Sequence, residues 1–146
     1  MRFTDTAATL PRPSGPPPWL GKLAENATLE GAVLKRAIHG KDNILALVSH
    51  ARTLYEFQDY SHYGYWGSEF FMESYRASIN GMPVECSVMV RINGAGEADS
   101  LLIHHYPLEA TLEFSRLMGE KFGDQFPDLY LDAAQAEGLA KAFGSK

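Results

Sequence analysis

The sequence predicts an α+β domain in which helices lie against one antiparallel sheet. The hydrophobic pattern repeats every three to four residues over 40–57 and every two residues from 57 to 106. Two Asn-Gly pairs, at 80–81 and 93–94, stand where successive strands would reverse. Helical patterns therefore flank a continuous antiparallel meander, which is the arrangement of an α+β fold.

The length of 146 residues suits one domain. We expect a proline-rich arm over residues 1–18 and a single domain over 19–146. The stretch "PRPSGPPP" (11–18) favours an extended backbone, because proline fixes φ and disfavours helix in the residue before it. Two interpretations of this arm are open: a docking peptide for a proline-binding module, or a lead-in that packs across the domain or a partner subunit.

Charge and composition exclude several classes of protein. The formal net charge is −5 and the basic residues are scattered, whereas a nucleic-acid binder shows a basic stripe. No apolar run approaches the roughly 18 residues of a membrane helix. The N-terminal residues contain no continuous apolar segment of the secretory type, and the single cysteine, Cys86, cannot form an internal disulfide. We therefore expect a cytoplasmic protein with neither nucleic acid nor membrane as partner.

The first elements are short, and one clear helix follows them. "WLGKLAE" (19–25) offers about two helical turns, and 27–38 predicts a strand or two short strands broken near Gly31. Over 40–57, Gly40 interrupts the chain and Asp42 suits the first turn of a helix, where its charge meets the helix dipole. The apolar stripe of this helix comprises Ile44, Leu47, Val48, Ala51, Leu54 and Tyr55.

The remaining chain predicts four strands and two helices. The strands are 57–66, 68–79, 83–92 and 98–108, and Pro107 ends the last of them. A helix follows over 107–123, and a shorter one is expected over 132–143. The residues expected to face inward from the first of these two helices are Leu108, Leu112, Leu117 and Met118.

Three stretches resemble the nuclear transport factor 2 (NTF2-like) superfamily and its SnoaL-like enzyme relatives. They are "NATLEGAVLKRAIHGKDNILALV", "FFMESYRASINGMPVECSVMVRINGAGEADSLLI" and "HHYPLEA" running into a helix, and together they cover roughly residues 19–120. The resemblance implies a curved antiparallel sheet wrapped around helices, forming a cone with an internal pocket. The long N-terminal helix usual in this fold is here shortened to "PWLGKLAE".

The resemblance also implies a homodimer formed through the outer face of the sheet. Strands 68–79 and 83–92 carry apolar residues on both faces, whereas a sheet covered on one side should alternate cleanly. A second subunit would provide the missing cover.

Ketosteroid isomerase is a relative whose chemistry can be tested residue by residue. Its chemistry needs a carboxylate base that moves a proton beside a carbonyl group. It also needs a tyrosine and a protonated aspartic acid, which together hold the enolate oxygen. An ungapped match places Gly31, Ala7 and Val88 at these three positions. None of these side chains can take up a proton or donate a strong hydrogen bond, so this chemistry is excluded.

The same match predicts which strand residues face the pocket. Residues facing inward would be Glu73, Tyr75, Ala77, Cys86, Val88, Leu101, Ile103 and His105. Residues facing outward would be Phe70, Met72, Ser74, Glu85, Met89, Leu102 and His104. Residues expected to bind a ligand are Leu47, Val48, Tyr55, Tyr63, Trp66, Ala77, Cys86, Val88, Leu101 and Ile103.

The adjacent histidines of "LLIHHYPL" invite a metal-site hypothesis, which the strand pattern disfavours. His104 and His105 point to opposite faces of a strand and cannot chelate one ion without a bulge. The other histidines show no metal-ligand spacing. We expect neither a metal nor another cofactor.

Two functions stay open. The first is a pocket protein that binds a small hydrophobic molecule without turning it over. The second is a dehydratase-, isomerase- or cyclase-like enzyme acting on a hydrophobic carbonyl compound. In it Glu73 and His105 would form an acid–base pair and Tyr75 would hold the developing oxyanion. A core role for His105, hydrogen-bonded to a backbone carbonyl, is the alternative to catalysis.

Overall fold

A computed structural model describes residues 10–11, 13 and 15–142 of the chain. The helical elements are the 3₁₀ helix η2 and the α-helices α1, α2 and α3: η2 Pro18–Lys22, α1 Lys41–Leu54, α2 Leu108–Phe122 and α3 Ala133–Ala142. The strands are β1 Leu23–Gly31, β2 Ile38–His39, β3 Gln58–Trp66, β4 Phe70–Ile79, β5 Met82–Ile92 and β6 Ala98–Tyr106. The predicted α+β class is confirmed.

All six strands belong to one curved sheet in the order β2-β1-β6-β5-β4-β3. The predicted meander is present, since β3, β4, β5 and β6 pair antiparallel in sequence order. The sheet is nevertheless mixed, because β1 pairs with β6 in parallel. No hairpin joins these two strands: the connection runs through α1 and the meander, as a parallel pair requires.

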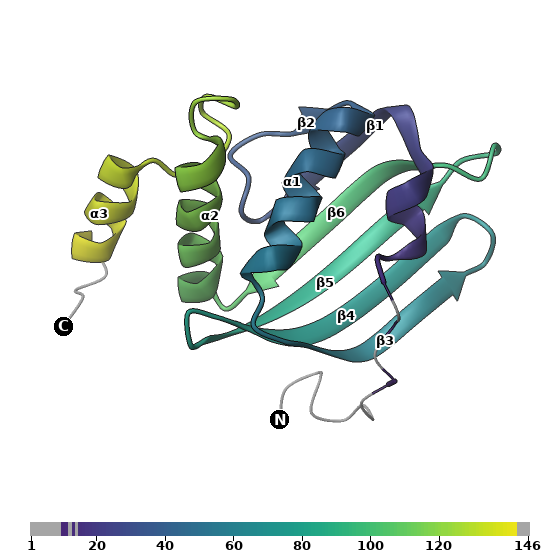
Figure 1. The fold of residues 1–146 in the computed structure, drawn as a ribbon, viewed down its shortest axis with the longest axis horizontal. Helices are drawn as coiled ribbons and strands as arrows, with labels where there is room; N and C mark the ends of the chain where they lie inside the picture. Colours follow the sequence, from purple (N-terminus) through teal and green to yellow (C-terminus); the bar gives the residue numbers. More distant parts are fainter. Residues whose placement is uncertain (1–9, 12, 14, 143–146) are drawn as a thin grey trace.

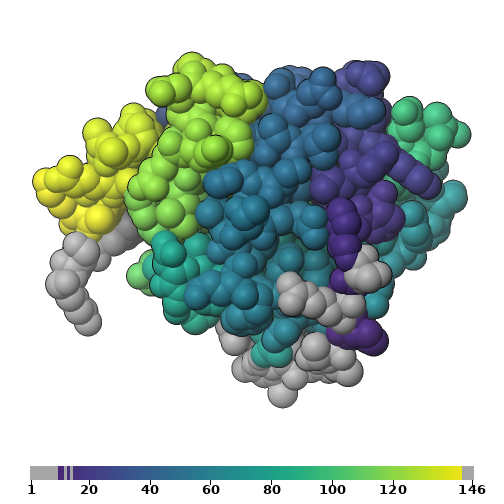
Figure 2. Space-filling view, in the orientation of Figure 1, coloured from purple at the N-terminus to yellow at the C-terminus, as the bar shows by residue number. Residues whose placement is uncertain are grey.

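The helices cover one face of the sheet. In Figure 1, α1 and η2 lie over the strands, α2 lies at the end where β6 finishes, and α3 lies beyond α2. The space-filling view shows these elements as a continuous layer with α3 at its edge (Figure 2). Residues of β4 alternate strictly between half-buried and buried, so one face of this strand packs into the core beneath the helices.

The stripe predicted for the first long helix is confirmed. Ile44, Leu47 and Val48 are buried on α1, and Ala51, Leu54 and Tyr55 pack against the same core. Gly40 precedes the helix with a φ of 102°, a conformation that favours glycine. Asp42 lies in the first turn, as expected from the helix dipole.

Two local predictions were wrong. The expected helix over 19–25 gives way to β1 at Leu23, because Leu23 pairs with Ala98 of β6 and is buried there. On α2, Leu108 is 60% exposed and does not face inward, whereas Met118 does. The buried residues of α2 are Ala110, Thr111, Phe114, Ser115, Met118 and Phe122. Two of them, Thr111 and Ser115, are polar, so a prediction based on apolar residues alone misses them.

Gly31 ends β1 at a place where the backbones come very close. A Cβ atom at this position would overlap the carbonyl oxygen of Ile103 on β6. Any larger residue would therefore push β1 away from β6. This contact explains in physical terms why the position matched to the base aspartate of ketosteroid isomerase holds glycine here. Ala7, matched to the tyrosine, lies outside the described residues.

The outer face of the sheet carries exposed apolar side chains. Trp66 is 69% exposed and Met89 is 38% exposed, and the register aligns Met72, Met89 and Leu102 across three strands. The strand alternation predicted from sequence thus leaves a second apolar surface with no helix of the described chain over it. Exposed apolar surface of this kind is typical of an interface.

We expect this outer face to pair with a second copy of the chain. The variant Met89→Glu should therefore be monomeric where the wild type is dimeric, because a charge at the interface is costly. Leu45→Glu is a matched control, since Leu45 on α1 is also 38% exposed. Sedimentation equilibrium measures the mass of all three. A monomeric wild type, or a dimer that survives Met89→Glu, would contradict the prediction.

Candidate functional site

A small pocket lies between the covered face of the sheet and the helices. Its volume is about 60 Å³. Side chains from η2, β1, α1, β3, β4, β5, β6 and α2 surround it, and most of them are apolar or aromatic. Those that bear on its chemistry are Trp19, Leu47, Val48, Arg52, Tyr55, Gln58, Tyr60, Glu73, Tyr75, Val88, Ile103, His105, Phe114 and Met118.

The structure brings eight of the sequence-predicted site residues into the pocket lining: Leu47, Val48, Tyr55, Glu73, Tyr75, Val88, Ile103 and His105. Ala77, Cys86 and Leu101 share the inner face but are buried in the core beside the pocket. Tyr63 and Trp66 lie on β3 at the sheet edge and do not line the pocket. Tyr63 is 39% exposed, and its hydroxyl donates to the backbone oxygen of Pro11.

A chain of hydrogen bonds crosses the floor of the pocket. Tyr75 Oη donates to Tyr55 Oη at 3.0 Å, and Tyr55 Oη lies 2.6 Å from Nε2 of His105. Register places Tyr75, Cys86 and His105 side by side on β4, β5 and β6, and α1 ends just before Tyr55. If each hydroxyl donates to the next group, Nε2 is the final acceptor and the imidazole proton resides on Nδ1.

Burial keeps His105 neutral. The ring is 5% exposed and stacks on Phe114, with centroids 4.3 Å apart. Burial lowers the pKa of His105 to about 3, with a smaller contribution from His104. Its Nδ1 is buried without a hydrogen-bond partner among the described residues. An imidazole with this pKa is a poor general acid or base near neutral pH, which weakens the catalytic role expected for His105.

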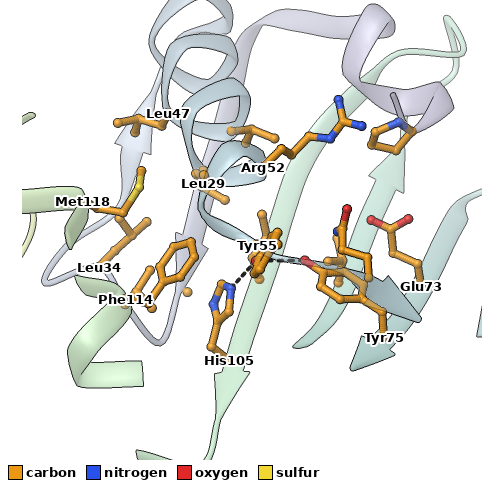
Figure 3. A pocket seen from close by; sticks show the side chains of 18 of the residues that line it. Leu29, Leu34, Leu47, Arg52, Tyr55, Glu73, Tyr75, His105, Phe114 and Met118 are labelled. Carbon is orange, nitrogen blue, oxygen red and sulfur yellow. Dashed lines mark hydrogen bonds between the residues drawn. The ribbon is translucent and has the colours of Figure 1, made fainter. Parts of the chain in front are cut away.

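Glu73 is a second buried ionisable group of the pocket. Its side chain projects from β4, is 6% exposed and lies below Arg52 of α1 (Figure 3). Burial raises the pKa of Glu73 to about 7, and the nearby Arg52 and Trp19 oppose this rise. The Trp19 indole N–H is close enough to lower that pKa, yet it makes no hydrogen bond of normal geometry with a described residue.

Glu73 and His105 share the pocket but form no direct pair. Glu73 aligns with Val88 and Ile103, one inward-facing position away from the row that holds His105. Strand spacing and rise put the two Cα atoms about 12 Å apart. Tyr55 occupies Nε2 of His105, and Nδ1 bonds to no described residue. The expected direct acid–base contact is therefore not made.

Three important lining residues were not predicted from the sequence to belong to the site: Trp19, Arg52 and Phe114. Trp19 appeared only as part of a short apolar turn after the prolines. Arg52 follows Val48 by four residues, so it borders the apolar stripe of α1, and this spacing was its only signal. Phe114 belongs to the inward stripe of α2, which was misjudged.

Among the described residues, no group of three or more His, Cys, Asp or Glu side chains is arranged to hold a metal ion. No helix in that part of the chain has both the length and the apolar character needed to cross a membrane.

No protein-family model matches the sequence, and no curated protein matches it. Solved structures do resemble the chain. An uncharacterised protein with a cystatin-like fold from Silicibacter pomeroyi DSS-3 aligns with a TM-score of 0.66 and 12% identity, over 72% of this chain and 74% of that one. A steroid delta-isomerase from Pseudomonas aeruginosa aligns with a TM-score of 0.66 and 12% identity, over 73% and 78%.

A de novo designed protein with a curved β-sheet aligns with a TM-score of 0.53 and 11% identity, over 64% of this chain and 75% of that one. The likeness to the cystatin-like protein and to the steroid delta-isomerase confirms the predicted curved-sheet α+β fold. At these identities the likeness shows the fold and supplies no substrate.

Glu73 and His105 should make opposite contributions to the pH dependence of stability. The folded chain retains the Glu73 proton up to about pH 7 whereas the unfolded chain releases it near 4.5, so ionisation weakens the fold by up to about 3 kcal/mol as pH rises. The unfolded chain binds a proton on His105 below about 6.5 and the folded chain binds it only near 3, so acidification also weakens the fold.

Between pH 4.5 and 6.5 these two slopes oppose each other in the wild type. We expect the free energy of unfolding of Glu73→Gln to rise with pH across this interval, and that of His105→Gln to fall. Urea unfolding at half-unit pH steps measures both, with the exposed Glu109→Gln as the control. Parallel curves for Glu73→Gln and the wild type would contradict the assignment.

Proposed function

We propose that this chain binds a small, largely apolar molecule in the pocket beneath α1. The observation that carries the proposal is a partly open, mainly apolar pocket in which a buried carboxyl group, Glu73, lies beside the buried Trp19 indole N–H, which has no hydrogen-bond partner of normal geometry among the described residues. Binding pockets characteristically combine apolar walls with a few placed polar groups. A buried polar group without a partner costs free energy, which a bound polar atom would recover.

The volume limits the size of this molecule. The pocket volume of about 60 Å³ is less than half the roughly 150 Å³ of an apolar cavity that binds benzene. A steroid would enter only if lining side chains moved. We therefore expect a ligand of a few non-hydrogen atoms, or one whose short apolar end enters the pocket.

Filling the pocket tests this proposal. In NMR titrations with 2-butanone or isobutanol, we expect shift changes centred on residues that line the pocket. Val88→Phe should abolish these changes, because Val88 lines the pocket. Met89→Phe, one residue along and on the opposite face of β5, should leave them intact. Equal responses from Val88→Phe and Met89→Phe, with both spectra folded, would refute binding in this pocket.

The pKa of Glu73 favours a second candidate function, acid–base catalysis without a cofactor. A carboxyl group with a pKa of about 7 is divided between acid and base at neutral pH, which suits general catalysis. In this version Glu73 acts alone: its carboxylate removes a proton beside a carbonyl group and returns it elsewhere. Neutral His105 holds Tyr55, and Tyr55 holds Tyr75, as positioning residues.

Hydrogen–deuterium exchange distinguishes catalysis from binding alone. If Glu73 acts as the base, 2-butanone in D₂O should lose its α-proton signal faster with the wild type than with Glu73→Gln. The difference should grow as pH rises through 7, because the carboxylate form increases. Identical exchange with both proteins, measured by proton NMR under conditions where butanone binds, would leave the non-catalytic function.

A further inference from the structure

Three polar side chains from different elements converge at the mouth of the pocket. Trp19 comes from η2, Arg52 from α1 and Glu73 from β4. Figure 3 shows the Arg52 guanidinium above the Glu73 carboxyl group, both among the residues that line the pocket. The two are close enough for Arg52 to lower the pKa of Glu73, yet they form no ion pair within 4.0 Å. A space bordered by these groups remains between them.

Each of the three groups retains capacity to bond. The Trp19 indole N–H is buried without a hydrogen-bond partner of normal geometry among the described residues. Arg52 makes one long hydrogen bond, 3.5 Å from Nη2 to the backbone oxygen of Gly15, and pairs with no acid in the described part of the chain. Two donors that are under-used, next to a carboxyl group, define a site for a polar ligand group.

Below the mouth the pocket becomes apolar. Leu47 and Val48 of α1, Val88 of β5, Ile103 of β6 and Met118 of α2 line it. A ligand that satisfies both regions has one polar end at the opening and a short hydrocarbon part inside. Because the Arg52 guanidinium and the Trp19 indole N–H are both donors, the polar end of the ligand must accept hydrogen bonds.

We propose that the ligand is a short aliphatic carboxylic acid, bound as its anion between the Arg52 guanidinium and the Trp19 N–H, with its hydrocarbon part in the pocket. This inference rests on the proposed binding function and names its ligand class. Guanidinium groups bind carboxylates by charge-assisted hydrogen bonds. Glu73 joins the site in its protonated form, in which its O–H donates to the anion.

The charges around Glu73 favour an anion over an amine. Burial raises the pKa of Tyr55, Tyr75 and Cys86, and lowers that of His105, so these four groups are uncharged at neutral pH. The other ionisable groups at the pocket are Arg52, Tyr60 of β3, the exposed Glu30 of β1, and Tyr130, whose pKa burial raises. A ligand ammonium group would lie against the Arg52 charge, which opposes its binding.

This arrangement makes binding depend on pH. Isobutyrate is an anion at both pH 6 and pH 8, whereas Glu73 changes from mostly protonated to mostly ionised between them. Because the anion binds the protonated form, its apparent affinity should be about tenfold weaker at pH 8 than at pH 6. Isobutanol, which is neutral and of similar size, should bind equally at both values.

The experiment is an NMR titration of the full chain with isobutyrate, isobutanol and isobutylamine at both pH values. Glu73→Gln should bind isobutyrate equally at pH 6 and pH 8, because glutamine stays neutral. Arg52→Gln should lose most of the isobutyrate affinity and keep that for isobutanol. Lys41→Gln removes a positive charge from the same helix away from the pocket and should behave as the wild type.

The outcomes separate this inference from the proposed function. If none of the three compounds binds in the pocket, the proposed function fails and the inference fails with it. If isobutanol binds while isobutyrate does not, or if isobutylamine binds more tightly than isobutyrate, the inference is overturned and the binding function stands. Isobutyrate binding that is stronger at pH 6 and depends on Arg52 supports the inference.

Discussion

The register of β4, β5 and β6 determines what lies inside this protein. Cross-strand alignment puts Tyr75, Cys86 and His105 in one row and Glu73, Val88 and Ile103 in the next, all beneath α1 and α2. A slip of one residue would send both rows to the outer face. The shape of the pocket, its polar groups and the exposed apolar surface on the other side all follow from this alignment.

Burial shifts the pKa values of Glu73 and His105 in opposite directions. It keeps Glu73 protonated up to about pH 7 and keeps His105 unprotonated down to about pH 3. Below about pH 6 both groups are therefore mostly uncharged, because each adopts the form that costs less to desolvate, whereas at neutral pH Glu73 is divided between its protonated and ionised forms. Arg52, half-buried at the mouth, is the charge that an entering molecule meets there.

Most of the correct predictions made from the sequence came from the two-residue periodicity of the strands. It predicted the meander, the inward-facing set and eight lining residues, because side-chain direction on a strand depends only on local alternation. It could not separate Cys86 and Leu101, buried in the core, from Val88 and Ile103, which line the pocket. That distinction depends on which helix lies above each position. Trp19 and Arg52 reach the pocket through the packing of distant segments, which no local pattern encodes.

The close approach of Gly31 to Ile103 limits how this scaffold could be redesigned. Grafting the catalytic aspartate of an isomerase onto this position would require β1 to shift away from β6, because the added carbon would collide with a main-chain oxygen. A designer seeking a base in this cone would have to retain the glycine and install chemistry on another strand.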